Sequence, residues 1–244
     1  MKILRKEAKY VWRNVQLNKS RVIIFLILLL LGFLLFIINV FPYASIGTIL
    51  ILLSYFLGIY TYQKYLTWKS GEISNDIVIE KLSKLPDSYV LISGVVVPPN
   101  RGDTDHIILG PNGIFVIEAK HYGGEIKCDG DDWERYKIGA KGKRYELWIG
   151  SPSNQVKRNA KVLKDFILKH KKEIFEERKR TPHIWVESIL IFTNERVNLN
   201  VNNPTVQILD IEEICDFILS QNFNYSLSEK EIEKISDLIL KNSK

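Results

Sequence analysis

The amino-acid sequence predicts an α/β fold in two parts: an N-terminal helical hairpin, then one α/β domain with a central mixed sheet. Two long apolar runs without charged residues lie near the start, at 22–40 and 44–62. Beyond residue 70 the apolar spacing predicts helix, antiparallel strand meander, helix, strand, strand and helices, in that order. A length of 244 residues suits one domain of ordinary size with an appendage.

The segment before the apolar runs is strongly basic. Residues 1–21 hold seven basic residues and one acidic residue, a net charge of +6: Lys2, Arg5, Lys6, Lys9, Arg13, Lys19 and Arg21 against Glu7. Positive charge beside an apolar segment is typical of the cytoplasmic side of a membrane. We therefore expect a basic cytoplasmic arm.

Each apolar run has 19 residues, enough for a helix to cross the ~30 Å hydrocarbon layer of a lipid bilayer. Pro42 between them interrupts a helix, so the sequence predicts a transmembrane helical hairpin over 22–62. The connection carries no basic residue, whereas Lys64 and Lys69 follow the second run. The positive-inside rule then predicts a two-span protein of the cell membrane with both termini and the following domain in the cytoplasm.

Two alternatives exist for the apolar runs. A cleavable signal peptide has an apolar core of roughly 7–15 residues and is not followed by a second run. Two buried helices of a soluble protein are the other alternative, but uncharged runs of this length are uncommon in soluble cores. The membrane hairpin explains both runs together with their basic flanks.

The domain at 70–244 opens with a predicted amphipathic helix over 70–85, capped by Ser70. Glu72 falls in its first turn, where a carboxylate ordinarily compensates the helix dipole. Pro86 ends this helix, the alternating run 89–97 predicts a strand, and a loop follows at 98–102.

Two apolar runs, 104–109 and 114–119, flank the turn-forming residues 110–113 and predict a β-hairpin. In this register Asp105 lies directly opposite Glu118. Because side chains alternate along a strand, Lys120 shares their face. Three charged groups therefore gather at one end of an otherwise apolar strand pair.

Two neighbouring carboxylates in such a place favour a bound cation. Burying a lone carboxylate costs several kcal/mol, and a second one raises the pKa of the first unless a cation lies between them. Hard divalent cations such as Mg²⁺ prefer oxygen ligands of this kind. The simpler alternative is that Lys120 pairs with Glu118 or Asp105 at a solvated strand end. Asp103 shares their face and is expected to be a solvated carboxylate of the loop. His106 is expected to be a packed histidine on the opposite face.

Residues 125–149 predict three short strands, 125–128, 133–138 and 144–149, separated by glycine-containing turns. Aromatic and basic residues alternate in them: Trp133, Tyr136, Lys137, Lys141, Lys143, Arg144, Tyr145 and Trp148. Such aromatics commonly pack the strands themselves. Alternatively, they stack nucleic-acid bases while the cations contact phosphates.

A long helix is predicted over 153–180, with ten basic and four acidic residues and hence a net charge of +6. Solvation explains a charged helix face; contact with anionic lipid headgroups and contact with nucleic-acid phosphates are the alternatives. Further strands are predicted at 185–194 and 205–209, and C-terminal helices at 211–220 and 229–241 with capping boxes at Asp210 and Ser228. Cys128 and Cys215 show neither zinc-site nor disulfide spacing, as suits a reducing cytoplasm.

The stretch from residue 70 to about 170 resembles the nuclease-related domain (NERD) family of the PD-(D/E)xK nuclease superfamily. The resemblance is carried by Gly71-Glu72, by LPDSYVLISGVVVP and by DTDHIILGPNGIFVIEAKHYGGEI. It implies a restriction-endonuclease-like αβββαβ core in which Asp105, Glu118 and Lys120 are the acidic and lysine positions, with Glu72 as a supporting acid. Gln155 stands where related nucleases carry a glutamine, but they continue as Q-x-x-x-Y and this chain has Asn159.

The resemblance implies a membrane-anchored nuclease that uses Mg²⁺, or Mn²⁺, to hydrolyse nucleic-acid phosphodiester bonds, with DNA as the expected substrate. Asp105, Glu118, the Ala119 carbonyl and Glu72 would hold the metal. Lys120 would orient the attacking water, and Gln155 would help to position the site or the substrate. The alternative is a catalytically silent membrane-anchored scaffold that binds nucleic acid or protein.

Overall fold

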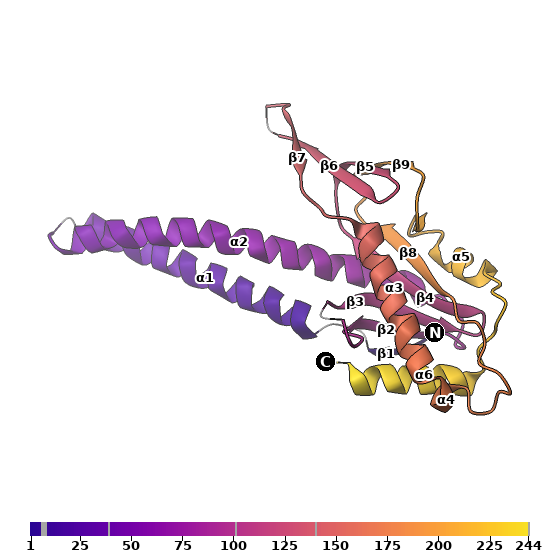
Figure 1. Cartoon of the computed structure of the whole chain (residues 1–244). Coiled ribbons are helices and arrows are strands. Elements are labelled where there is room, and N and C mark those ends of the chain that lie inside the picture. The colour runs from indigo at the N-terminus through magenta and orange to yellow at the C-terminus, as the bar shows by residue number, and fades with distance from the viewer. Residues whose placement is uncertain (6–8, 39, 101, 140, 244) are drawn as a thin grey trace. The chain divides into compact units, whose positions relative to one another are not determined.

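The computed structural model describes residues 1–5, 9–38, 40–100, 102–139 and 141–243 (Figure 1). Residues 6–8, 39, 101 and 140, which fall in the predicted arm, first apolar run, loop and turn, lie outside the described residues. The chain divides into two compact units: Met1–Ala8 with Ser74–Lys244, and Lys9–Ile73. The second unit is therefore inserted, along the chain, into the first.

The unit Lys9–Ile73 consists of helix α1 (Lys9–Ile37) and most of helix α2 (Tyr43–Leu82). Both helices are long and apolar enough to cross a membrane, by length and composition, and they confirm the predicted pair of apolar helices. Their backbones approach closely: a Cβ added to Gly47 would lie 2.7 Å from the carbonyl oxygen of Gly32. Large apolar side chains such as Leu34 and Phe56 are exposed along both helices.

Two boundaries in this region differ from the predictions. Helix α2 runs without a break for 40 residues, so the separate helix predicted to start at Ser70 was wrong, and Glu72 lies inside a helix instead of in a first turn. No proline interrupts the chain between Pro42 and Pro86, which allows one continuous helix. Residues 1–21 are likewise not one arm, because Lys2–Arg5 forms strand β1 and α1 begins at Lys9.

The main sheet has six strands in the order β1-β2-β3-β4-β8-β10. Strands β2, β3 and β4 form an antiparallel meander, while β1, β8 and β10 each pair in parallel with a neighbour, which confirms the predicted mixed sheet. Apart from β1 the strands are β2 (Val90–Val95), β3 (Thr104–Gly110), β4 (Gly113–Lys120), β8 (Val186–Phe192) and β10 (Gln207–Leu209).

A second, four-stranded sheet has the order β7-β6-β5-β9. Three of its strands were predicted: β5 (Gly124–Asp129), β6 (Asp132–Ile138) and β7 (Arg144–Leu147). Strand β9 (Val197–Asn202) was not, because every second residue of VNLNVN is an asparagine and the segment resembles a polar loop. It pairs in parallel with β5.

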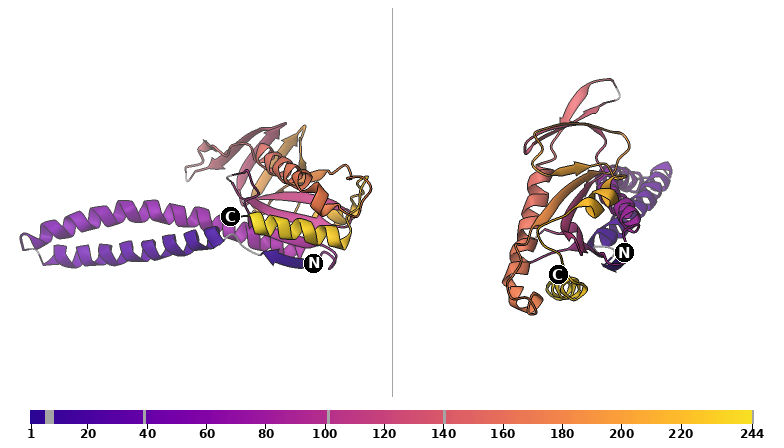
Figure 2. Two further views of the ribbon diagram at one scale, coloured as in Figure 1. Left: turned by 60° about the horizontal axis from the view of Figure 1, so that its bottom comes forward. Right: turned by 90° about the vertical axis from the view of Figure 1, so that its right-hand side faces the viewer.

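Helices cover both faces of the main sheet (Figures 1 and 2). One face packs against α3 (Pro152–Lys169) and α6 (Glu229–Asn242), and the other against the end of α2 from Val78 and against α5 (Ile214–Ser220). Strand β4 is buried along nearly its whole length. A strand buried on both faces has no ordinary place for a charged side chain.

Two helix predictions need correction. The helix predicted over 153–180 ends at Lys169, and only the short α4 (Lys171–Ile174) follows. The chain bends at His170, which brings Ile174 and Phe175 into the core. The capping box at Ser228 is present, whereas Asp210 accepts from the amide of Glu212 and precedes a turn instead of capping α5.

Candidate functional site

The β3–β4 hairpin has the predicted register. Pairs run from Gly110 with Gly113 to His106 with Ile117, and the same register brings Asp105 level with Glu118. Beyond the last backbone pair, the Asp105 carboxylate accepts a hydrogen bond from the Ala119 amide at 2.9 Å. The side chain of Asp105 thus takes the place of a strand carbonyl and is held against β4.

Glu118, Lys120 and Gln155 meet at this end of the hairpin. The Lys120 ammonium donates to Glu118 Oε1 at 2.5 Å and to Gln155 Oε1 at 3.1 Å. Glu118 is only 1% exposed, and its other oxygen, Oε2, has no hydrogen-bond partner among the described residues. A buried carboxylate oxygen without a partner is costly, so this atom marks a place for a ligand.

The electrostatics of this group are unbalanced. Burial, and then the nearby charge of Asp105, raise the pKa of Glu118 well above its ordinary value, although Lys120 opposes the shift. Burial alone would lower the pKa of Lys120, but Glu118 and Asp105 outweigh it and the pKa is raised. One lysine therefore faces two carboxylates, and a further positive charge would stabilise both of them ionised.

The donor set fits a hard divalent cation. Asp105 and Glu118 supply carboxylate oxygens, and the Ala119 carbonyl lies between Glu118 and Lys120 in the chain. The described part of the chain contains no group of three or more His, Cys, Asp or Glu that would hold a metal by itself. Mg²⁺ commonly binds through one or two carboxylates and keeps several waters, so two carboxylates suffice for it.

Glu72 belongs to the unit Lys9–Ile73, in which its carboxylate accepts from the Lys69 ammonium at 2.5 Å. Its role as a supporting acid stays a prediction.

Asn159, the departure from the Q-x-x-x-Y pattern that the resemblance implies, contacts the loop before β3. It is 1% exposed, its Oδ1 accepts from Asn100 at 2.9 Å, and its Nδ2 donates to the main-chain oxygen of Asp103 at 3.3 Å. Asp103 is exposed as a whole residue, but burial, and then the nearby charge of Asp105, raise the pKa of its carboxyl. The sequence comparison gave Asn159 only as a departure from a pattern, whereas the structure gives it a part in orienting the segment that leads into Asp105.

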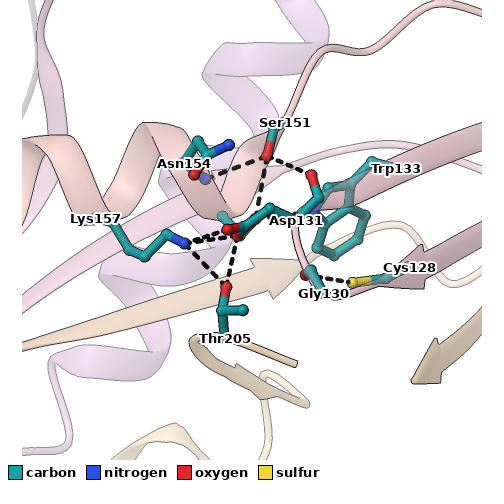
Figure 3. A network of polar contacts seen from close by, with 9 residues as sticks. Cys128, Gly130, Asp131, Trp133, Ser151, Asn154, Lys157 and Thr205 are labelled. Atoms are coloured by element: carbon teal, nitrogen blue, oxygen red, sulfur yellow. Dashed lines mark hydrogen bonds and ion pairs between the residues drawn. The ribbon is translucent and has the colours of Figure 1, made fainter. Parts of the chain in front are cut away.

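Asp131 fixes the start of the helix that carries Gln155 (Figure 3). Its carboxylate accepts from Lys157 at 2.5 and 2.7 Å and from Thr205 at 2.6 Å. The hydrogen bond from Lys157 is the main reason why its pKa falls to about 2. The same turn binds the N-terminus of α3 through further hydrogen bonds of Ser151, Ser153 and Trp133. Sequence reasoning missed Asp131, because its partners are distant in the chain.

The histidines near the site have other partners. His106 is fully buried and shares a hydrogen bond with Ser93, and burial lowers its pKa to about 3, so it is a neutral packed side chain as predicted. His121 shares a hydrogen bond with Thr193 at 3.0 Å, and partial burial lowers its pKa.

Comparison with known proteins identifies a relationship over the region that contains this site. The model of the "Nuclease-related domain" family (NERD) matches residues 69–193, which is 125 of the 244 residues. An uncharacterised protein of Bacillus anthracis is 43% identical over 63 residues, which cover 24% of this chain and 29% of that relative. The match thus spans less than a third of the relative's length. No solved structure matches the chain.

The matched region runs from the last third of α2 to the residue after β8 and includes Asp105, Glu118, Lys120 and Gln155. The register and the buried charges of the hairpin agree with the sequence pattern of residues 105–120 that carries the resemblance. The chain therefore belongs to the nuclease-related domain family.

Proposed function

We propose that this protein is a membrane-anchored, divalent-metal-dependent nuclease that hydrolyses phosphodiester bonds, with DNA as its substrate. The observation that supports this most is Glu118: a fully buried carboxylate with one unpartnered oxygen, beside a second carboxylate and one lysine. Without a further cation this arrangement is unfavourable. Membership of a nuclease-related family supports the same reading.

Asp105 and Glu118 would hold the metal, together with the Ala119 carbonyl. When bound, Mg²⁺ or Mn²⁺ supplies a Lewis acid for the phosphate and lowers the pKa of water. Lys120 donates a hydrogen bond to Glu118, so the ammonium orients this carboxylate and reduces its repulsion of Asp105.

Lys120 is the group that we expect to act on the reacting atoms. Its ammonium has three N–H donors, of which two point to Glu118 and Gln155. The third is left to hold the attacking water or to stabilise the negative charge that develops on the phosphate oxygens. Gln155 acts as a positioning residue, since its carbonyl oxygen fixes the direction of the lysine side chain.

The membrane part of the proposal is supported by helices α1 and α2. Met1–Ala8 and Ser74–Lys244 form one compact unit, so the two ends of the inserted hairpin lie on one side of any membrane that it crosses. The basic residues of 1–21 and Lys64 favour the cytoplasmic side. The lipid bilayer, with anionic headgroups near the basic flanks, is then a partner of the chain.

The test is a cleavage assay with the full chain in lipid nanodiscs. Labelled DNA and RNA are incubated with Mg²⁺, Mn²⁺ or EDTA, beside Asp105→Ala and a matched control, Asp165→Ala, whose exposed carboxylate pairs with Lys161 on the outside of α3. We expect metal-dependent cleavage by wild type and the control, and none by Asp105→Ala. Cleavage that survives in Asp105→Ala sinks the assigned site. Wild-type protein that binds DNA without cutting it under any metal condition would instead indicate a scaffold.

A further inference from the structure

A two-stranded ribbon projects from the second sheet (Figures 1 and 2). Strand β6 pairs with β5 only as far as Tyr136, and beyond it Lys137 and Ile138 pair with β7 alone. We call residues 132–148 the β6–β7 ribbon; it comprises β6, the turn, β7 and Trp148 directly after β7. Its outer half has no other strand beside it among the described residues.

Large apolar side chains of the β6–β7 ribbon are open to solvent. Trp148 is 92% exposed, Ile138 77% and Tyr145 45%. In the described part of the chain no aromatic ring or cation stacks on Trp148, whereas Trp133 at the base packs against Phe192. A tryptophan this exposed adds nothing to the core, and exposed apolar patches rimmed by polar residues mark interaction sites.

The cations of the β6–β7 ribbon are of two kinds. Arg144 is engaged within the protein, since it pairs with Glu125 at 3.0 Å and lies over the Tyr136 ring at 3.7 Å. Lys137, Lys141 and Lys143 are exposed, and no described acidic group forms an ion pair with any of them. From 137 to 148 there are four basic residues and one acidic residue, a net charge of +3. The available positive charge thus lies in the outer half.

The base of the β6–β7 ribbon is joined to the candidate site at both ends. Arg135 donates two hydrogen bonds, at 3.1 and 3.0 Å, to the carbonyl of Gly123, three residues after Lys120, and its guanidinium lies over Tyr122. At the other end Trp148 comes seven residues before Gln155 in the chain. The ribbon therefore extends from the segment between two residues of the site.

We propose that the β6–β7 ribbon binds a single-stranded segment of nucleic acid next to the candidate nuclease site, with one base stacked on Trp148 and phosphates on Lys141 and Lys143. The inference rests on the proposed function in that the bound strand is the one to be cut. Stacking on an open indole needs an unpaired base, which is why the partner is a single strand. A lipid-inserting ribbon would carry apolar residues at its tip, but the turn holds Gly139, Lys141, Gly142 and Lys143.

The experiment measures binding without metal, so that cleavage plays no part. Full-chain protein in nanodiscs of neutral lipid is titrated in EDTA against a fluorescein-labelled single strand and the matching duplex, followed by anisotropy. Trp148→Ala is compared with Trp185→Ala, which removes another exposed tryptophan, and the pair Lys141→Ala and Lys143→Ala with the exposed pair Lys171→Ala and Lys172→Ala. Thermal unfolding checks that all variants fold.

Trp148→Ala should weaken single-strand binding roughly five- to a hundredfold at every salt concentration, since it removes one stacked base. The double lysine variant should reduce the slope of log affinity against log salt by about 1.4, for two phosphate contacts with a single strand. The two controls should bind as wild type does. The proposal is overturned if Trp148→Ala binds the single strand as tightly as wild type does. It is also overturned if wild type binds the duplex more tightly than the single strand and Trp148→Ala keeps the same preference.

Failure of this inference and failure of the proposed function are separable. If Asp105→Ala loses cleavage and Trp148→Ala binds normally, the site stands and the ribbon proposal falls. If wild type binds the single strand through Trp148 yet never cuts it, the ribbon proposal stands and the proposed nuclease function is wrong. A lipid contact is tested by tryptophan fluorescence in nanodiscs that contain brominated lipid, which quenches a tryptophan that it touches. If wild type is quenched and Trp148→Phe loses this quenching, the indole of Trp148 contacts lipid and the proposal is overturned.

Discussion

The end of the β3–β4 hairpin and the β6–β7 ribbon both carry charged side chains on paired strands, but in opposite surroundings. In the hairpin Glu118 is buried beside Asp105 and Lys120, and burial opposes its negative charge. In the ribbon Lys141 and Lys143 are solvated, and charge there costs nothing. The same residue types are thus informative in one place and ordinary in the other, because only a charge that is unfavourable in its fold requires a functional explanation.

The sharpest test of this contrast replaces one lysine from each region. Lys120→Met should lower the turnover of a saturating DNA substrate by roughly 10²–10³-fold, the usual effect of removing one donor that stabilises developing charge. Lys143→Met, on the ribbon, should raise KM and leave turnover unchanged. Steady-state cleavage kinetics measure both. Similar changes in turnover would remove the distinction between a chemical site and a binding surface.

The burial contrast has a stability counterpart. Ile107→Ala empties a fully buried position of β3 and should cost about 2–5 kcal/mol of unfolding free energy. Ile138→Ala truncates a side chain that is 77% exposed and should change the unfolding free energy by less than about 0.5 kcal/mol. Denaturant unfolding followed by near-ultraviolet circular dichroism compares them. A comparable loss in both variants would mean that the ribbon packs against something in solution.

Glu118→Gln tests whether the buried carboxylate awaits a cation. The pKa of Glu118 is raised in the folded state, so protonated Glu118 favours folding below its unfolded pKa, and this contribution is lost as the pH rises through the folded pKa. Without metal at pH 8, Glu118→Gln should therefore unfold at a higher temperature than wild type. Mn²⁺ should raise the midpoint of wild type but hardly that of the variant.

The matched control is Glu146→Gln on the ribbon, where the carboxylate is exposed. It should respond to pH and to Mn²⁺ as wild type does. A Mn²⁺ shift that is undiminished in Glu118→Gln would show that the metal binds elsewhere.

The smallest effect is expected at Asp131, which lies between the two regions along the chain. Its folded pKa of about 2 is below the ordinary 3.8, so its contribution to stability is present above the ordinary value and is lost as the pH falls towards 2. Because the pair with Lys157 is partly solvated, we expect Asp131→Asn to cost only about 0.5–1 kcal/mol at neutral pH.

Between about pH 4 and 2, unfolding curves of Asp131→Asn should lose less stability than those of wild type. The neighbouring Asp132→Asn serves as the control, since its exposed side chain lies outside the network. An equal loss of stability between about pH 4 and 2 in all three proteins would contradict the role of Asp131 in stabilising the start of α3.

The features predicted from sequence are those that follow from short-range rules. Turn glycines at 110 and 113 set the hairpin register, and the two-residue strand period then placed Asp105, Glu118 and Lys120 on one face. The two uncharged runs predicted apolar helices by length alone. A local pattern is sufficient in both cases. A different hairpin register would turn apolar side chains to the wrong face, and the apolar runs satisfy their backbone polar groups within a helix.

What sequence reasoning missed depends on partners far along the chain. Strands β1 and β9 are short and carry polar residues, and each pairs with a strand distant in the chain, β2 or β5. Asp131 acquires its role from Lys157 and Thr205, 26 and 74 residues away. The end of α3 at Lys169 follows from the need to bury Phe175, which periodicity within the helix does not show.

The place of β1 in the sheet also constrains how the protein is made. Strand β1 precedes its partner β2 in the chain by about 85 residues, and both apolar helices lie between them. At ~5–20 residues per second this is a delay of roughly 4–17 s. During that time β1 lacks β2 as a pairing partner while α1 and α2 are synthesised. The main sheet can therefore be completed only after both α1 and α2 have been made, although its first strand precedes them in the chain.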